Sequence, residues 1–276
     1  MAARSARIQP RQRGVQSAMI PLRPLLATLL ASAALHAGAH DTWFEPLPAG
    51  ENEVLLALGT GTQYPKLDTS LDARYLVQQG CSTAGEAAAT RMRPVRNTHT
   101  ALVLRAPRDA ASCWAQLMPF EVEIPAATVE VYFKDIQATA EVRAAWAAMR
   151  QRGLPWRERY TKHARIELGS APSAPSPMDF DQRLESGGQP LQVGATLVAQ
   201  LLRDGRPLAG QALQLLSENS PLGIWRTTDE QGRIRVTVPL AGHWLLRGVD
   251  LHVSATDPDR WESRFVTLAF AVLPKS

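Results

Sequence analysis

Short apolar runs separated by turn residues fill the C-terminal third of this 276-residue chain, and their spacing is what most constrains its fold. Turn signals recur at short spacing, at Asp204-Gly205, Ala209-Gly210, Asp229-Glu230-Gln231-Gly232 and Ala241-Gly242. The apolar runs between them are residues 191–202, 213–216, 234–238, 244–247, 251–255 and 265–272. Regularly spaced short strands with Gly and Asp at the turns predict an antiparallel β-sandwich over residues 187–276.

One of these turns predicts a particular strand pairing. Gly232 comes two residues before Ile234, where a new apolar run begins. Glycine adopts positive φ without steric cost and can close a tight hairpin. We therefore expect the strand from Ile234 to lie beside the strand that precedes the turn.

The sequence before residue 169 also predicts strands, together with one helix. Runs typical of strands cover residues 53–58, 100–105 and 129–133. Between residues 138 and 153, apolar side chains recur at helical spacing, and Gly153-Leu154-Pro155 supplies a stop signal. We therefore expect a β-rich unit that contains one amphipathic helix.

A segment rich in proline and serine separates these two parts of the chain. Residues 169–177 contain three prolines and small side chains without apolar periodicity, which is typical of a connector. The predicted organisation is a leader at 1–39, an N-terminal β-rich domain at 40–168, a linker at 169–186 and a C-terminal sandwich at 187–276. The fold class expected is mainly β, with two β-sandwich-like units.

The leader has the three parts of a secretory signal peptide. From Met19 it contains a basic start that ends at Arg23, an apolar stretch at residues 25–31, and the small residues Ala37-Gly38-Ala39 before the expected cut at His40. Four further arginines precede Met19, either as a long basic region or because translation starts at Met19. The apolar stretch is shorter than the ~20 residues that a membrane helix needs, and no later run reaches that length. We expect an exported, periplasmic protein without a transmembrane helix after cleavage; a buried N-terminal helix of a cytosolic protein is the alternative.

Removing the leader changes the charge balance of the chain. The full sequence has 30 Lys and Arg against 26 Asp and Glu, and the leader contains five Arg and no acidic residue. Taking those five from 30 leaves 25 basic residues against 26 acidic ones, a net charge of −1. No basic stripe remains to suggest that the protein binds nucleic acid.

The only two cysteines are Cys81 and Cys113. In an oxidising compartment, two cysteines in one domain favour a disulfide over a metal pair, and no CxxC spacing is present. Closing a loop of this length stabilises a fold by about 3–4 kcal/mol in the chain-entropy model. We expect the two residues to form a disulfide.

Several ordered motifs resemble one family of exported bacterial proteins. They are His40-Asp41-Thr42-Trp43-Phe44-Glu45-Pro46, Tyr160-Thr161-Lys162, Gly205-Arg206-Pro207-Leu208-Ala209-Gly210, Thr228-Asp229 with Gly232-Arg233, Ala241-Gly242-His243-Trp244-Leu245, and Trp261-Glu262-Ser263 with Phe265 and Thr267-Leu268. The family is catalogued as a domain of unknown function and described as the periplasmic component of nickel or cobalt uptake. The resemblance implies an immunoglobulin-like or transthyretin-like second half, transition-metal cargo and a membrane transporter component as a partner.

The residues themselves suggest where a metal ion could bind. If cleavage follows Ala39, the α-amine and imidazole of His40 form a chelate, and Asp41 can add a carboxylate. Ni²⁺, Co²⁺ and Cu²⁺ accept such donors, with Cu²⁺ bound more tightly than Ni²⁺ at equal availability. A two-donor chelate needs partners, for which His163 and His243 are the candidates. No two histidines stand at a compact ligand spacing, so the fold must assemble the site.

Other functional classes find less support in the sequence. No Gly-x-Ser-x-Gly motif marks a nucleophile, so we expect a non-enzymatic protein. An oxidase that uses copper at an N-terminal histidine is one alternative. Another is an interaction module that binds no metal and docks on a transporter or a surface polymer, with Trp225, Trp244 and Trp261 as a candidate exposed patch.

Overall fold

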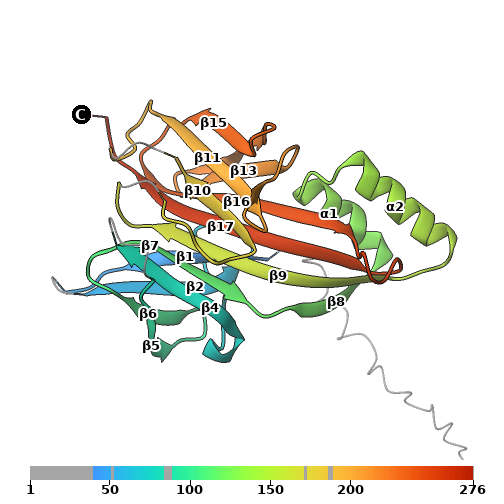
Figure 1. Cartoon of the computed structure of the whole chain (residues 1–276), viewed down its shortest axis with the longest axis horizontal. Helices are drawn as coiled ribbons and strands as arrows, with labels where there is room; N and C mark the ends of the chain where they lie inside the picture. Colours follow the sequence, from blue (N-terminus) through green and yellow to red (C-terminus); the bar gives the residue numbers. More distant parts are fainter. Residues whose placement is uncertain (1–39, 51–52, 84–88, 171–172, 186–188, 276) are drawn as a thin grey trace, which may run out of the picture. The chain divides into compact units, whose positions relative to one another are not determined.

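The computed structural model describes residues 40–50, 53–83, 89–170, 173–185 and 189–275. Residues Ala37–Ser276 form one compact unit (Figure 1). The predicted signal peptide at 1–39, with its cleavage site, lies outside the described residues. None of the helices in the described ranges is long and apolar enough to cross a membrane.

The described chain is mainly β, as predicted, and its strands form three sheets. The central sheet has eight strands: β4 (Leu76–Thr83), β7 (Ala110–Leu117), β8 (Phe120–Ile124), β9 (Trp156–Glu167), β13 (Ala212–Ser217), β14 (Ser220–Thr227), β16 (Gly242–Val253) and β17 (Trp261–Val272). The five-stranded N-terminal sheet contains β1 (Asp41–Leu47), β2 (Val54–Gly61), β3 (Thr69–Ser70), β5 (Arg93–Asn97) and β6 (Leu102–Ala106). The four-stranded C-terminal sheet contains β10 (Phe180–Leu184), β11 (Thr196–Arg203), β12 (Arg206–Pro207) and β15 (Arg233–Thr237).

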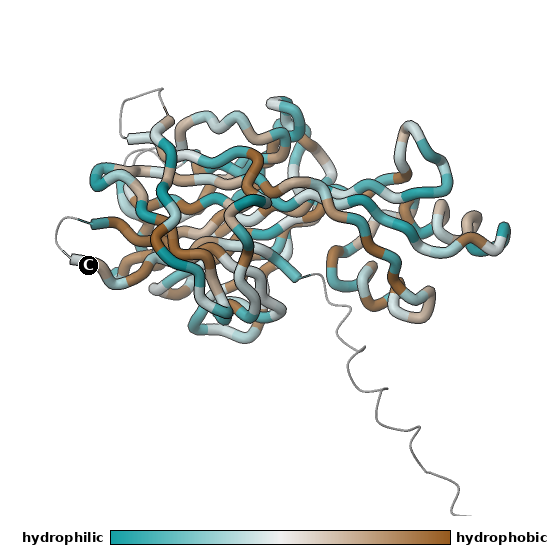
Figure 2. Tube along the Cα trace, turned by 90° about the horizontal axis from the view of Figure 1, so that it is seen from below, coloured by the Kyte–Doolittle hydropathy of each residue, from teal (hydrophilic) through white to brown (hydrophobic). Residues whose placement is uncertain are grey.

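The central sheet is covered on both faces. Successive side chains of a strand point to opposite faces, and on β16 Leu245 packs in the core shared with the N-terminal sheet whereas Leu246 packs in the core shared with the C-terminal sheet. On β17, Ala269 packs in the core shared with the N-terminal sheet, and Leu268 packs in the core shared with the C-terminal sheet. Burial on both faces explains the apolar runs at 244–246 on β16 and 268–272 on β17. Figure 2 shows the hydrophobic segments of the trace in brown. The sheets therefore pack face to face, which confirms the predicted mainly-β, sandwich-like fold.

Two short helices cover the far ends of β9, β16 and β17 (Figure 1). The predicted helix is confirmed as α2 (Ala140–Gln151), which begins after Thr139, whose hydroxyl accepts a hydrogen bond from the Val142 amide. The strand predicted at residues 129–133 is wrong, because this segment is helix α1 (Val129–Asp135). Its buried side chains, Val129, Tyr132 and Phe133, stand at helical rather than strand spacing.

The predicted linker at 169–186 divides the sequence into two parts, but the strands of these two parts do not form two separate domains in the fold. Strand β9, before this segment, pairs in parallel with β17, after it, so one sheet contains strands from both halves. The linker assignment also needs correction, because Phe180–Leu184 is strand β10 and pairs with β11. Polar contacts hold this segment in place: Ser173 bonds to Glu167, and Ser176 bonds to Asp181. The sequence of this proline- and serine-rich segment has no apolar periodicity, so its packing could not be predicted.

The turn at Gly232 does not form the expected hairpin. Gly232 has the predicted positive φ of 68°, and a Cβ there would lie 2.6 Å from the Leu201 carbonyl oxygen. However, β14 pairs with β13 in the central sheet, whereas β15 pairs with β11 in the C-terminal sheet. The turn therefore carries the chain from one sheet to the other.

The predicted disulfide between Cys81 and Cys113 is confirmed. The two residues are directly opposite each other on β4 and β7, with an S–S distance of 2.08 Å. Both side chains are buried beside Trp43 and Ala115 in the core beneath the N-terminal sheet. The bond therefore joins the outer strand of the central sheet to its neighbour within an apolar core.

Candidate functional site

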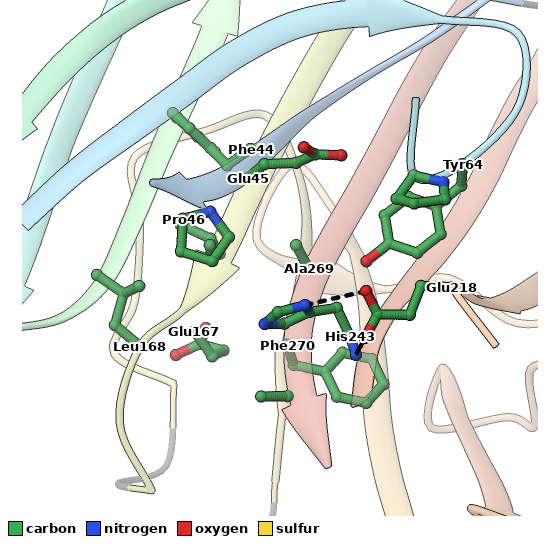
Figure 3. A pocket seen from close by; sticks show the side chains of 13 residues that line it. Phe44, Glu45, Pro46, Tyr64, Glu167, Leu168, Glu218, His243, Ala269 and Phe270 are labelled. Carbon is green, nitrogen blue, oxygen red and sulfur yellow. Dashed lines mark hydrogen bonds and ion pairs between the residues drawn. The ribbon is translucent and has the colours of Figure 1, made fainter. Parts of the chain in front are cut away.

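A pocket of about 340 Å³ opens where β1 crosses the ends of β9, β16 and β17 (Figure 3). Strand β1 provides one wall, and the loop after β2 provides another. The lining residues are Phe44, Glu45, Pro46, Tyr64, Pro65, Ile166, Glu167, Leu168, Glu218, His243, Ala269, Phe270 and Ala271. The walls are thus largely apolar, with a few carboxylates and one imidazole between them.

Glu45 is held by contacts within and around β1. The indole Nε1 of Trp43 donates a hydrogen bond of 3.0 Å to Glu45 Oε1, because residues two apart on a strand share a face. The ring of Tyr64 packs edge-on against Trp43 at 5.8 Å. The Thr267 hydroxyl donates to the Thr42 carbonyl oxygen at 2.6 Å, which fixes β1 on β17. The aromatic contacts therefore position a carboxylate at the pocket.

His243 and Glu218 form the second polar group of the pocket. The backbone amide of His243 donates to Glu218 Oε1 at 2.7 Å, and the ring Nδ1 lies 3.2 Å from Glu218 Oε2. The other ring nitrogen points away from Glu218 into the pocket (Figure 3). This approach requires glycine at position 242, where φ is +112° and a Cβ would lie 2.5 Å from Glu218 Oε1. The turn sequence thus brings an imidazole and a carboxylate together.

The pocket is acidic. Its lining includes three glutamates and no Lys or Arg among the described residues, although Arg165 pairs with Glu167 at 2.7 Å. Burial raises the pKa of Glu45, and Glu218 raises it further, while Trp43 and His243 act in the opposite direction. The pKa of Tyr64 is also raised, first by burial and then by Glu45 and Glu218. Glu45 and Glu218 therefore create a negative potential that favours a cationic ligand.

The four residues predicted to bind a metal ion do not form one site. His163 is buried, and its ring nitrogens lie 2.9 Å from the Phe265 carbonyl oxygen and 2.6 Å from Asp179 Oδ1. Both nitrogens are engaged within the protein, and the bond to Asp179 lowers the pKa of that carboxyl group. A metal ion would have to displace these bonds, so His163 has a structural role here.

The residues predicted at the start of the exported chain lie at the other end of β1. Asp41 is buried 3.1 Å from Arg247, and the His40 carbonyl oxygen accepts a 2.6 Å hydrogen bond from Lys162. Five strand positions separate His40 from Glu45, a distance of about 16 Å. Within the described residues, no three His, Cys, Asp or Glu side chains are grouped closely enough to hold a metal ion as they stand. His243 is thus the one predicted ligand at the pocket.

Sequence reasoning missed Glu45 and Glu218. Glu45 lies in the Trp43-Phe44-Glu45-Pro46 motif, whose two aromatic residues are buried in the core beneath the N-terminal sheet. Glu218 follows β13 at a turn, where an acidic residue carries no functional signal by itself. The proposed aromatic patch is absent, because Trp244 and Trp261 are buried and Trp225 is only partly exposed.

Comparisons with known proteins do not place the chain in a family. No family model matches it, and no curated protein matches it. Among solved structures, one similar chain is the D0-D1 domain of intimin, with a TM-score of 0.19 and 9% sequence identity over 83% of this chain and 97% of that one. A similarity at this level carries no argument about fold or function.

Proposed function

We propose that this protein is an exported, non-enzymatic binding protein for a transition-metal ion, with nickel or cobalt as its cargo in metal uptake. The observation that supports this most is the pairing of His243 with Glu218 in an acidic pocket that also contains Glu45. The family resemblance of the motifs at residues 40–46 and 241–245 favours the choice of metal. The pocket contains residues from both motifs.

The donor chemistry of the pocket suits such an ion. Imidazole nitrogen and carboxylate oxygen are donors that Ni²⁺ and Co²⁺ accept. A histidine that binds a metal commonly has a carboxylate at its other ring nitrogen, which fixes the tautomer and the ring orientation. Glu218 occupies that position at Nδ1 of His243 and leaves Nε2 to face the pocket (Figure 3). Glu45 would supply a carboxylate, and the cargo ion would retain other ligands such as water.

Calorimetric titration with Ni²⁺, Co²⁺ and Cu²⁺ tests this proposal. We expect dissociation constants tighter than ~10 μM, with affinity reduced at least tenfold by His243→Gln, which removes a direct donor. Glu218→Gln should cost about 10- to 100-fold, the range found for residues that orient a ligand. His252→Gln, on the same strand but away from the pocket, is the matched control and should bind normally. The absence of binding by the unaltered protein, or equal losses in the control, would contradict the proposal.

A second function is favoured by the size and walls of the pocket. A space of about 340 Å³ with apolar walls is much larger than a bare ion and could receive a Lys or Arg side chain of a partner protein. The protein would then be an interaction module that docks on a transporter or a surface polymer without metal. Recovery of a partner from a chelator-treated lysate by the unaltered protein, but not by the Glu45→Gln, Glu218→Gln double variant, would favour this function.

A further inference from the structure

Strand β5 is an exposed edge strand with an unusual concentration of arginine. It is the outermost strand of the N-terminal sheet, whose order is β1-β2-β6-β5, and its five residues are all exposed. Arg93 and Arg96 lie within the strand, and Arg91, also exposed, precedes it. Three guanidinium groups are therefore presented within six residues of one sheet edge.

An irregularity in the strand places two of these arginines on one face. Arg93 pairs with Arg105 of β6 and Pro94 pairs with Leu104, but the next pair is Arg96 with Val103. The extra residue, Val95, shifts the alternation by one position, as a β-bulge does. Arg96 and Arg93 are opposite Val103 and Arg105, which are two apart on β6 and so share a face. Without the bulge, Arg96 would point to the opposite face.

This arrangement does not serve the stability of the fold. Like charges directly opposite each other on neighbouring strands are destabilising, and Arg93 is directly opposite Arg105. Arg105 is compensated by an ion pair with Glu53 at 2.9 Å. Arg91, Arg93 and Arg96 have no ion pair with any residue that the structure describes. An anionic partner outside the chain would compensate them.

The backbone of β5 argues against a peptide that adds to the sheet as another strand. Pro94 has no N–H to donate, and the bulge interrupts the regular ladder that an added strand requires. Recognition must therefore come from side chains. Val95 is 41% exposed between Pro94 and Arg96. Arginines that flank an exposed aliphatic side chain match the interface of a bilayer, where cations meet lipid phosphates and an apolar group reaches the acyl boundary.

We propose that β5, with Arg91, Arg93, Arg96 and Val95, docks this protein on an anionic phospholipid surface. The docking edge and the pocket use different residues, so this interaction is independent of the proposed cargo. A membrane-bound binding protein would deliver its ligand over a short distance to a transporter in the same membrane.

Sedimentation with lipid vesicles tests the proposal. The protein used is the chain from His40 on, which belongs to one compact unit and lacks the basic leader. We expect binding at low salt to vesicles of equal parts phosphatidylglycerol and phosphatidylcholine, and none to phosphatidylcholine alone. Each arginine near an anionic surface contributes about a fivefold gain in affinity, so Arg93→Gln with Arg96→Gln should weaken binding about 25-fold.

A charge-matched control separates a local site from net charge. Arg206→Gln with Arg235→Gln removes two exposed arginines from the C-terminal sheet and should leave vesicle binding unchanged. Because Arg93 opposes another arginine, the test variant should unfold at the same temperature as the parent or higher. No binding to anionic vesicles, or equal losses in both double variants, would overturn the proposal. Binding to soluble polyphosphate but not to vesicles would also overturn it and assign the edge to a polymer.

Discussion

Replacing Arg165 with leucine is expected to lower the free energy of unfolding by about 3–5 kcal/mol, the usual cost of removing one partner from a buried ion pair. The Arg165 side chain is fully buried between two carboxylates, with Nε 2.7 Å from Glu167 and Nη1 2.9 Å from Asp181. Its Nη2 donates to the Ala174 carbonyl oxygen at 2.5 Å. Burial raises the pKa of Glu167 even beside this cation. Leucine would fill space but leave Glu167 buried without a counter-ion and Asp181 paired only with the partly exposed Arg183.

Urea unfolding of the variant measures this loss. Arg183→Leu is the matched control, because Arg183 also pairs with Asp181, at 3.3 Å, but is partly exposed. The control should lose at most about 1 kcal/mol, as is usual for pairs in contact with water. Because Arg165 ties residues 174 and 181 to β9, the Leu variant should also be cleaved faster by proteases in this segment. A loss no larger than that of Arg183→Leu would show that the buried pair does not stabilise the fold.

Replacing Glu158 with leucine is expected to cost about 3–5 kcal/mol, because three buried donors lose their acceptor. Glu158 accepts hydrogen bonds from Trp156 Nε1 at 2.9 Å and from the Tyr132 hydroxyl at 3.1 Å, and also from the Ser263 hydroxyl. These groups join β9, β17 and α1 beside the stacked rings of Trp156 and Trp261, whose centroids are 4.6 Å apart. Glu158→Gln keeps an acceptor oxygen and should lose less than half as much.

The two variants also differ in how stability depends on pH. Burial raises the pKa of Glu158 above its ordinary 4.5, with the three hydrogen bonds acting in the opposite direction. The folded state therefore binds more protons than the unfolded state between 4.5 and the folded pKa, so this group's contribution to stability falls as pH rises through that window. Glu158→Gln lacks this contribution. Urea unfolding at several pH values should show that the stability of the wild type relative to Glu158→Gln falls as the pH rises through that window. A stability difference that stays constant with pH would contradict this expectation.

The strands were largely predictable because they obey local rules. Runs such as 265–272 lie between apolar cores on both faces of the sheet, so most of their residues are apolar. Strand β16 is one continuous strand although the sequence suggested two runs, at 244–247 and 251–255. Between them, Gly248 allows close packing, since a Cβ there would lie 2.3 Å from Leu213. Asp250 is buried but paired with Arg203 at 3.1 Å. Gly248 and Asp250 therefore do not interrupt the strand, because tertiary contacts accommodate them.

The arrangement of the sheets and the pocket could not be predicted in the same way. The parallel pairing of β9 with β17 joins segments about a hundred residues apart, and no local pattern encodes such a partner. The pocket likewise combines Glu45 from β1, Glu218 from a turn and His243 from β16. The sequence indicated His243 as a candidate ligand. Glu45 and Glu218 come close to it only because the fold brings β1, the turn after β13 and β16 together.

The most direct test of the proposed cation site is Co²⁺ titration of the isotopically labelled chain from His40 on, followed by two-dimensional amide NMR spectra. Paramagnetic Co²⁺ shifts and broadens nearby signals, and Zn²⁺ serves as a diamagnetic control. The account predicts that the first signals affected are those of Phe44, Glu45, Tyr64, Glu218 and His243, which surround the pocket. Effects centred on His40 and Asp41, or on His163, with unchanged pocket signals would contradict it.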